Sequence, residues 1–328
     1  MKKIILPIII MLVIVFGYFI FFFNKEENTN LKKVKVAEVA HSIFYAPQYV
    51  AKELGYFEDE GLDVEIILAS GADAVAASVI SGDVQIGFCG SEQTIYTYNQ
   101  GSKDYLVNFA ALTKKDGSFL VSRKKTDKFK IEDLKGSYII AGRQGGMPAM
   151  TLEWALNQKN ITRNDLTFDT SIAFASMGGA FVGGTGDYVS LFEPTATQME
   201  KQGKGHIVAS IGELGGTVPY TTYNAKKSYI ENNQDVIEKF SKAINKGLKY
   251  VHSHNANDIA KLITKEFPDV TINDLTTMVQ RYMDIDSWFD NTYISEKDFE
   301  HIQEIMKNAG ELSKKAPYDK LVITKYSK

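Results

Sequence analysis

The feature that most constrains the fold is a repeated alternation of short strand-like and helix-like segments. Strand-like segments lie at 34–39, 64–68, 84–88 and 105–112. The helix-like stretches between them begin near Pro47 or Gly71 and end at glycines such as Gly55 and Gly82. Proline in a first turn and glycine after a last turn are typical helix boundaries. Strand-helix-strand order with short connections predicts a mainly parallel sheet with helices on both faces.

The pattern then starts again, and it ends in a helical tail. The second set of strand-like segments lies at 118–122, 137–141, 167–170, 187–191 and 206–211, with a further one at 219–223. Amphipathic helices are expected at 231–251, 256–266, 272–284 and 296–309. In the first of these, Val236, Phe240, Ile244 and Leu248 form an apolar row at four-residue spacing, which predicts a core-facing side.

Two α/β segments and a helical tail predict an α/β fold with two lobes. We expect residues 31–118 and 224–328 to form a discontinuous first lobe and residues 119–223 the second, with 1–30 as a membrane anchor or signal and a linker. Ligands of such sheets bind outside the carboxyl ends of the strands, and clefts between domains are favoured sites. The loops that follow the strands are therefore the expected binding surface.

The N-terminus predicts attachment to a membrane. Lys2 and Lys3 precede the apolar run 4–23, which is long enough for a helix to span a bilayer and is followed by polar residues. The run ends in bulky side chains, so an uncleaved anchor is favoured over a cleaved signal peptide, which remains the alternative. Lysines before the run place it in the cell membrane with the body on the extracytoplasmic side.

Composition excludes several classes of function. A formal net charge of −3 gives no basic surface for nucleic acid. The only cysteine, Cys89, permits no intramolecular disulfide, and its place between Phe88 and Gly90 at a strand end predicts a buried thiol. No metal-binding spacing of His and Cys is present, so neither a metal nor a cofactor is expected. The body is expected to be monomeric.

Several motifs resemble one family. They are YAPQYVAKELGYFEDEGLDV at 45–64, Gly71, SGDVQIG at 81–87, DLKG at 133–136 and Glu193-Pro194. In this order and spacing, from Val34 to about Tyr318, they resemble the solute-binding proteins of nitrate, sulfonate and taurine ABC importers, whose domain is also described as SsuA/THI5-like. The resemblance implies a two-lobed, type II periplasmic-binding-protein-like fold.

The resemblance also implies a function. It implies an extracytoplasmic substrate-binding component of an ABC importer, with a permease and its ATPase as partners. The implied ligand is a small organic or anionic solute: a sulfonate, taurine, nitrate or a pyrimidine thiamine precursor. In one respect the sequence departs from the family, because no cysteine follows the apolar run to carry a lipid. A spanning helix would then be the tether.

The strongest local feature is the glycine-rich segment 142–151. Its candidate ligand contacts are Arg143, Gly145, Gly146, Met147, Pro148 and Ala149. Glycines allow backbone N–H groups to approach a ligand, and a following helix start adds free donors. Arg143 could pair with a sulfonate or carboxylate. A plain glycine turn with a solvent-facing arginine remains the alternative, and the GK[ST] ending of a phosphate loop is missing.

The other candidates follow predicted strands or lie on the crossing strand. They are His41, Ser42, Phe44, Tyr45, Gly71, Ala72, Gly90, Ser91, Glu92, Phe192, Glu193, Tyr220 and Thr221. The family resemblance implies that the loops at 71–72 and 90–92 touch ligand. A lone histidine is more often structural, and Glu92 could equally interact with the dipole of its own helix. Two carboxylates, Glu92 and Glu193, favour a cationic, zwitterionic or hydrogen-bond-donating ligand over a simple anion.

The sequence is compatible with three functions to different degrees. A solute receptor that closes around its ligand accounts for the two lobes and the motifs. A pyrimidine-forming or hydrolytic enzyme lacks a nucleophile motif and a metal set, so no catalytic residue is predicted. A ligand sensor that docks on a signalling partner remains an alternative.

Overall fold

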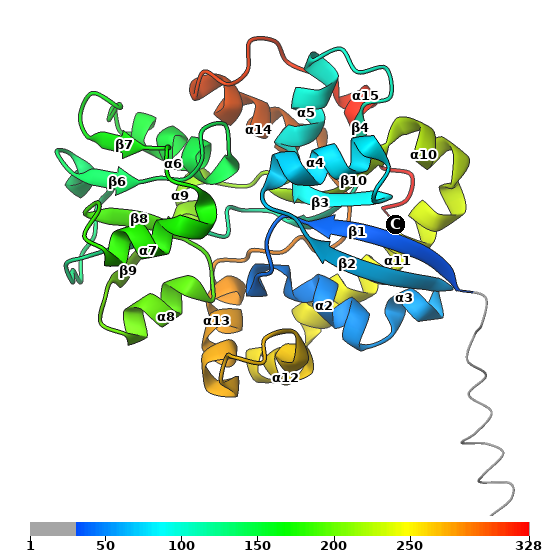
Figure 1. The fold of residues 1–328 in the computed structure, drawn as a ribbon, viewed down its shortest axis with the longest axis horizontal. Helices are drawn as coiled ribbons and strands as arrows, with labels where there is room; N and C mark the ends of the chain where they lie inside the picture. Colours follow the sequence, from blue (N-terminus) through cyan, green and yellow to red (C-terminus); the bar gives the residue numbers. More distant parts are fainter. Residues whose placement is uncertain (1–30, 328) are drawn as a thin grey trace, which may run out of the picture. The chain divides into compact units, whose positions relative to one another are not determined.

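A computed structural model describes residues 31–327, which contain two five-stranded sheets (Figure 1). The first sheet has the order β2-β1-β3-β10-β4, with β1 at Lys32–Glu38, β2 at Leu62–Leu68, β3 at Ile86–Gly90, β4 at Leu106–Thr113 and β10 at Thr221–Lys226. The second has the order β7-β6-β8-β5-β9, with β5 at Phe119–Ser122, β6 at Tyr138–Ile140, β7 at Thr167–Asp169, β8 at Tyr188–Leu191 and β9 at His206–Ser210. We call the parts built on these sheets the first and second lobes.

The direction of each strand reflects how the chain reaches it. Strands joined by helical crossovers pair in parallel, as β1 does with β3, and β6 with β7 and β8. By contrast, β5 is the first strand after the chain enters the second lobe, and β10 the first after it returns. Both strands run antiparallel to the two strands beside them: β5 to β8 and β9, and β10 to β3 and β4. Each sheet is therefore mixed: its antiparallel pairs involve the first strand that the chain forms after it crosses from the other lobe.

Helices cover the sheets. The first lobe carries α2 (Ala46–Glu53), α3 (Tyr56–Asp59), α4 (Ala72–Ser81) and α5 (Glu92–Asn99), and the second carries α6 (Met147–Asn157), α7 (Met177–Val182), α8 (Thr195–Lys201) and, at its exit, α9 (Ile211–Gly215). The C-terminal segment forms α10 (Lys227–Asn232), α11 (Gln234–Ser253), α12 (Ala256–Ile263), α13 (Ile272–Asp284), α14 (Glu296–Asn308) and α15 (Tyr318–Leu321). Short 3₁₀ turns η1 to η4 lie at Ile43–Tyr45, Ile131–Leu134, Phe174–Ser176 and Thr264–Glu266.

The long helix α11 supplies much of the first lobe's core. The predicted row of Val236, Phe240, Ile244 and Leu248 is fully buried. The helix begins later than predicted, because Asn233 leaves the helical conformation and separates α10 from α11. Gly247 lets α11 approach α2 closely: a Cβ added there would lie 2.2 Å from the carbonyl oxygen of Pro47.

Two segments connect the lobes, and they are bonded to each other. The amide of Val218 donates to the carbonyl of Lys114, and that of Tyr220 to Thr113, each at 3.0 Å. Where they meet, a Cβ on Gly212 would lie 2.2 Å from the Asp116 carbonyl oxygen. The passages therefore form one paired connection, which suits a hinge. The sheets divide the chain near 118 and 221, and we propose the predicted lobe ranges on this basis, although β10 begins inside the range given to the second lobe.

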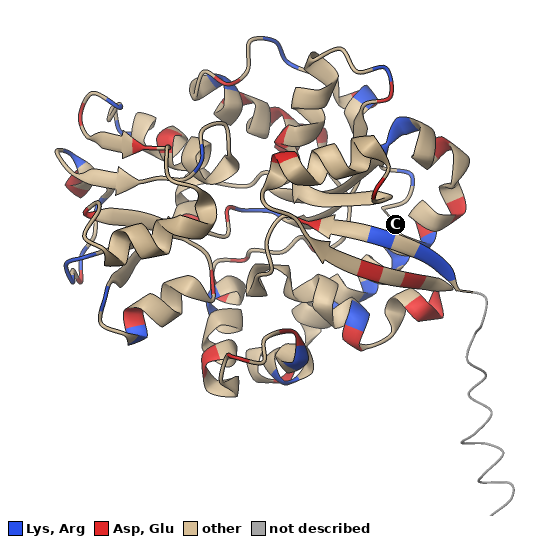
Figure 2. Cartoon of the chain, in the orientation of Figure 1, with Lys and Arg blue, Asp and Glu red and all other residues tan. Residues whose placement is uncertain are grey.

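The charged residues are mixed in sign over the described residues that Figure 2 displays. Lys35 on β1 lies beside Glu65 on β2, at 3.8 Å, and α11 carries two exposed Lys–Asp/Glu pairs at four-residue spacing. Cys89 is fully buried, as its position at a strand end predicted.

Among residues 31–327, no helix is both long enough and apolar enough to cross a bilayer. The predicted anchor at 4–23 lies outside the described residues.

Candidate functional site

A cleft with a volume of about 550 Å³ lies where the two lobes face each other. From the first lobe and the returning segment it is lined by Val39, Ala40, His41, Tyr45, Leu68, Ala69, Ser70, Gly71, Ala72, Gly90, Glu92, Tyr220 and Thr221. From the second lobe it is lined by Arg143, Gly146, Met147, Pro148, Ala173, Phe174, Ala175 and Phe192. Apart from Tyr220 and Thr221, these residues lie at or just after the carboxyl ends of β1, β2, β3, β6, β7 and β8. This is the edge at which open α/β sheets bind ligands.

Most of the predicted contacts meet at this cleft. Those that line it are His41, Tyr45, Gly71, Ala72, Gly90, Glu92, Arg143, Gly146, Met147, Pro148, Phe192, Tyr220 and Thr221. The sequence reasoning missed Val39, Ala40, Leu68, Ala69, Ser70, Ala173, Phe174 and Ala175. The loop after the strand predicted at 167–170 carries the last three, so the rule applied to the other strand ends would have included it.

The remaining predicted residues do not line the cleft. They are Ser42, Phe44, Ser91, Gly145, Ala149 and Glu193. The Ser42 hydroxyl donates to the Glu193 carbonyl at 2.7 Å, and that of Ser91 donates to the Pro219 carbonyl at 2.6 Å. Both hydroxyls are therefore engaged by backbone carbonyls.

The others among these residues also have structural partners. Phe44 is fully buried beneath the cleft, 5.8 Å from the ring of Phe192, and Ala149 is buried in the second lobe. The Gly145 carbonyl accepts a hydrogen bond from Tyr96 at 3.1 Å, which joins the two lobes.

Glu193 holds the lobes together. Its side chain is fully buried and accepts hydrogen bonds from the amide and hydroxyl of Thr197, at 2.8 Å each. Its charge is met by the guanidinium of Arg281 on α13, which also donates to the Thr197 hydroxyl at 2.7 Å. Glu193 is a predicted ligand contact, and in the structure its carboxylate is instead engaged by Arg281 from the C-terminal helices of the first lobe.

Glu92 is the buried acid of the cleft. It begins α5, is 2% exposed, and lies folded over Gly90, where a Cβ would be 1.9 Å from Glu92 Oε2. Within residues 31–327, Oε2 has no hydrogen-bond partner and Oε1 receives a long contact of 3.4 Å from Gln93. The residue's own backbone N–H and the charge of Arg143 also act on this carboxyl. Burial raises the pKa of this carboxyl to about 7.

Arg143 lines the cleft and reaches across to the first lobe. Its guanidinium lies 3.1 Å from the carboxylate of Asp73 on α4, in a pair exposed on both sides. The next residue, Gln144, donates to Glu311 and accepts from Thr170 at 3.1 Å. The glycine-rich segment thus makes contacts with the first lobe that are separate from the contact between Glu193 and Arg281. The predicted anion contact of Arg143 stays a prediction.

Aromatic side chains form the walls of the cleft. The ring of Tyr45 packs edge-on against Phe88 at 4.5 Å, and that of Phe192 against Phe174 at 5.7 Å. Phe174 and Leu68 come from different lobes, yet both are strongly exposed at the cleft, at 44% and 61%. Large exposed apolar side chains in a concave site are typical of ligand-binding surfaces.

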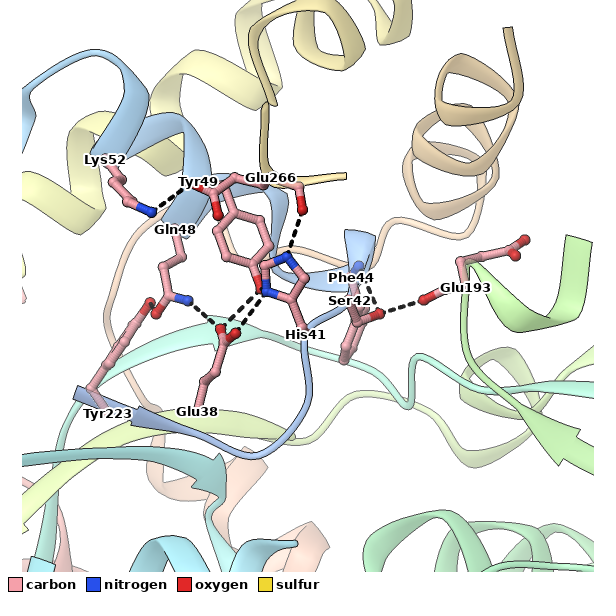
Figure 3. A network of polar contacts seen from close by, with 10 residues as sticks. All are labelled: Glu38, His41, Ser42, Phe44, Gln48, Tyr49, Lys52, Glu193, Tyr223 and Glu266. Atoms are coloured by element: carbon pink, nitrogen blue, oxygen red, sulfur yellow. Dashed lines mark hydrogen bonds and ion pairs between the residues drawn. The ribbon is translucent and has the colours of Figure 1, made fainter. Parts of the chain in front are cut away.

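His41 lines the cleft, and both of its ring nitrogens are engaged (Figure 3). Nδ1 lies 2.8 Å from the carboxylate of Glu38, and Nε2 donates to the Glu266 carbonyl at 2.8 Å. Gln48 and Tyr49 each donate to the same buried carboxylate at 2.9 Å. The hydrogen bond to Glu38 raises the pKa of His41. Its role is therefore mainly to tie the first strand's loop to the helical tail.

Replacing His41 with glutamine is expected to lower stability more in acid than in base. A raised folded-state pKa contributes stability that is fully present below the unfolded value of about 6.5 and is lost as the pH rises through the folded value. Because the ring is about one third exposed, the difference should not exceed about 1 kcal/mol. Urea unfolding of both proteins at pH 5.5 and pH 9 measures it. An equal loss at both pH values would contradict the raised pKa.

Among residues 31–327, no group of three or more His, Cys, Asp and Glu is placed to hold a metal ion.

Comparison with known proteins gives consistent matches. Residues 43–257 match the family model described as NMT1/THI5 like. A protein of Bacillus subtilis (strain 168) named "Putative binding protein YtlA" is 46% identical over 299 residues, covering 91% of this chain and 89% of the relative.

Solved structures share the fold. The alkanesulfonate-binding protein SsuA from Xanthomonas axonopodis pv. citri, bound to MOPS, superposes with a TM-score of 0.72 at 12% identity, covering 90% of this chain and 99% of that one. The periplasmic nitrate-binding protein NrtA from Synechocystis PCC 6803 gives 0.68 at 14% identity, with coverage of 89% and 86%. The fold is the two-lobed, type II periplasmic-binding-protein-like fold that the sequence predicted.

Proposed function

The chain belongs to the NMT1/THI5-like family, and from this we propose that it is the extracytoplasmic substrate-binding component of an ABC importer. The family and the B. subtilis relative support a role in binding, not in catalysis. A cleft lined from both lobes, beside a paired connection between them, carries the proposal. Ligand would contact both lobes and favour the closed form by binding it more tightly.

The proposed ligand is a small organic or anionic solute. A cleft of about 550 Å³ lies within the range typical of small-molecule sites. The structural neighbours are named for binding alkanesulfonate and nitrate, which keeps sulfonates, taurine and nitrate among the candidates. A pyrimidine thiamine precursor also remains a candidate, because the resemblance to the SsuA/THI5-like family implies it.

The proposed setting is the outer face of the cell membrane. We infer from the sequence that the apolar run 4–23 anchors the protein there and that the body delivers its ligand to a permease and its ATPase. The body is proposed to act as a monomer.

Calorimetry and small-angle scattering on the full-length protein in detergent test the proposal. The panel is taurine, alkanesulfonates, nitrate and aminopyrimidines, with scattering recorded for each ligand that binds. Binding of at least one member, together with a smaller radius of gyration in its presence, is the expected result. Saturable binding without any change in the protein's dimensions would contradict closure, and no binding across the panel would overturn the ligand class.

A further inference from the structure

The charged side chains that line the cleft differ in whether they already have partners. His41 is held by Glu38 and Glu266, and Arg143 is paired with Asp73. Of these three side chains, only that of Glu92 has a buried polar atom, Oε2, without a hydrogen-bond partner in residues 31–327. A buried carboxyl oxygen without a hydrogen bond is costly, so a ligand that donates one would gain more here than elsewhere in the cleft.

The surroundings of Glu92 restrict what such a ligand can be. Tyr45, Phe192 and Tyr220 line the same cleft, so the body of the ligand lies against aromatic rings. An inorganic anion would place negative charge in a cleft that holds a buried acid, and the guanidinium of Arg143 that lines it is already paired with Asp73 and acts on the Glu92 carboxyl. The volume of about 550 Å³ also exceeds what a three- or four-atom ion fills.

From this geometry we propose that Glu92 is the specificity-determining residue of the cleft and selects organic ligands that carry an N–H donor, as a protonated amine or an amino group on a ring. The inference deepens the proposed binding function and rests on it. Glu92 would accept a hydrogen bond from the nitrogen through Oε2, while the aromatic walls hold the apolar part. Its pKa of about 7 supports this, since the carboxyl can meet either a cationic or a neutral donor near neutral pH.

Position as well as chemistry supports the assignment. Glu92 follows β3, the central strand of its sheet, and the neighbouring β1 ends and β10 begins at the cleft, so the acid lies at the centre of the first lobe's binding edge. Gly90 leaves the space that the carboxyl occupies, and a side chain there would force the acid to move. The acid is thus held by the fold in a fixed place, as a selective site requires.

Four probes test the proposal with the full-length protein: benzylamine, 4-aminopyrimidine, benzenesulfonate and nitrate. Calorimetry is expected to show that the wild type prefers the first two over the anions. Glu92→Gln is expected to weaken the binding of benzylamine by about 10- to 100-fold, the loss typical of a charge-assisted hydrogen bond. Glu65→Gln, on the exposed face of β2, is the matched control and should change the affinity by less than about twofold.

Thermal unfolding without ligand gives a second readout. Because Glu92→Gln removes a poorly satisfied buried acid, the variant is expected to be at least as stable as the wild type while it binds amines less well. A preference of the wild type for benzenesulfonate, or equal benzylamine affinity in both proteins, would overturn the role of Glu92 and leave the binding function intact. Absence of binding by all four probes would also overturn it, and the separate panel above then judges the binding function.

Discussion

Replacing Arg281 with methionine is expected to lower the free energy of unfolding by about 3 kcal/mol or more. The substitution keeps an apolar stem of similar length but leaves the fully buried Glu193 carboxylate without its cation. Removing one partner of a buried ion pair typically costs about 3–5 kcal/mol, because the remaining charge is uncompensated. The contact lies between α13 and the start of α8, so lobe packing should loosen with it. Urea unfolding at pH 7 measures the loss.

The matched control is Lys201→Met, which breaks a more exposed ion pair between α8 and α13. Lys201 lies 2.7 Å from Asp274, but the lysine is more than half exposed. Surface pairs contribute only about 0–1 kcal/mol, so this variant should unfold almost as the wild type does. A similar loss in both variants would show that burial of Glu193 is not what makes the Arg281 contact strong.

Gly247→Ala is expected to destabilise the first lobe by about 1–3 kcal/mol, although alanine is the better helix former. The added methyl would meet the Pro47 carbonyl oxygen at 2.2 Å, which is backbone and cannot turn away. Helices α2 and α11 must then separate, and overpacking of this kind outweighs the gain in helix propensity. Thermal unfolding followed by circular dichroism gives the sign directly.

The same substitution at Gly179 should have the opposite effect. Gly179 lies in α7 with an ordinary helical conformation, and an added Cβ there has no neighbour within 4 Å. Alanine should therefore stabilise the protein by about 0.5–1 kcal/mol through the lower entropy of the unfolded chain. If both variants shifted stability in the same direction, close helix contact at Gly247 would not be the cause.

The elements could be predicted from the sequence because their signals are local. Alternating or continuous apolar segments predicted the strands, and the apolar row at four-residue spacing predicted the buried face of α11. The antiparallel direction of β5 and β10 could not be found in this way, since it depends on where the chain goes after leaving a lobe. The break at Asn233 was also missed, because asparagine is compatible with both a helix interior and a turn.

The cleft was predictable for a topological reason, and the lobe contacts were not. Residues that follow parallel strands share one edge of a sheet, so His41, Gly71 and Glu92 could be grouped from the sequence alone. Glu193 lies in a similar loop, but its partner Arg281 is 88 positions away on an amphipathic helix where arginine normally faces solvent. No local pattern distinguishes such an arginine from its exposed neighbours.

The burial of Cys89 gives direct experimental access to the motion between the lobes. It is the only cysteine of the chain, it is inaccessible, and burial raises its pKa, so it holds little of the thiolate that reacts with maleimides. Cysteines introduced at Ile80 on α4 and Val182 on α7, which are both exposed, would therefore take a donor and an acceptor dye without removal of the native thiol. Energy transfer between the dyes would then follow opening and closing in single molecules whose interior is unaltered.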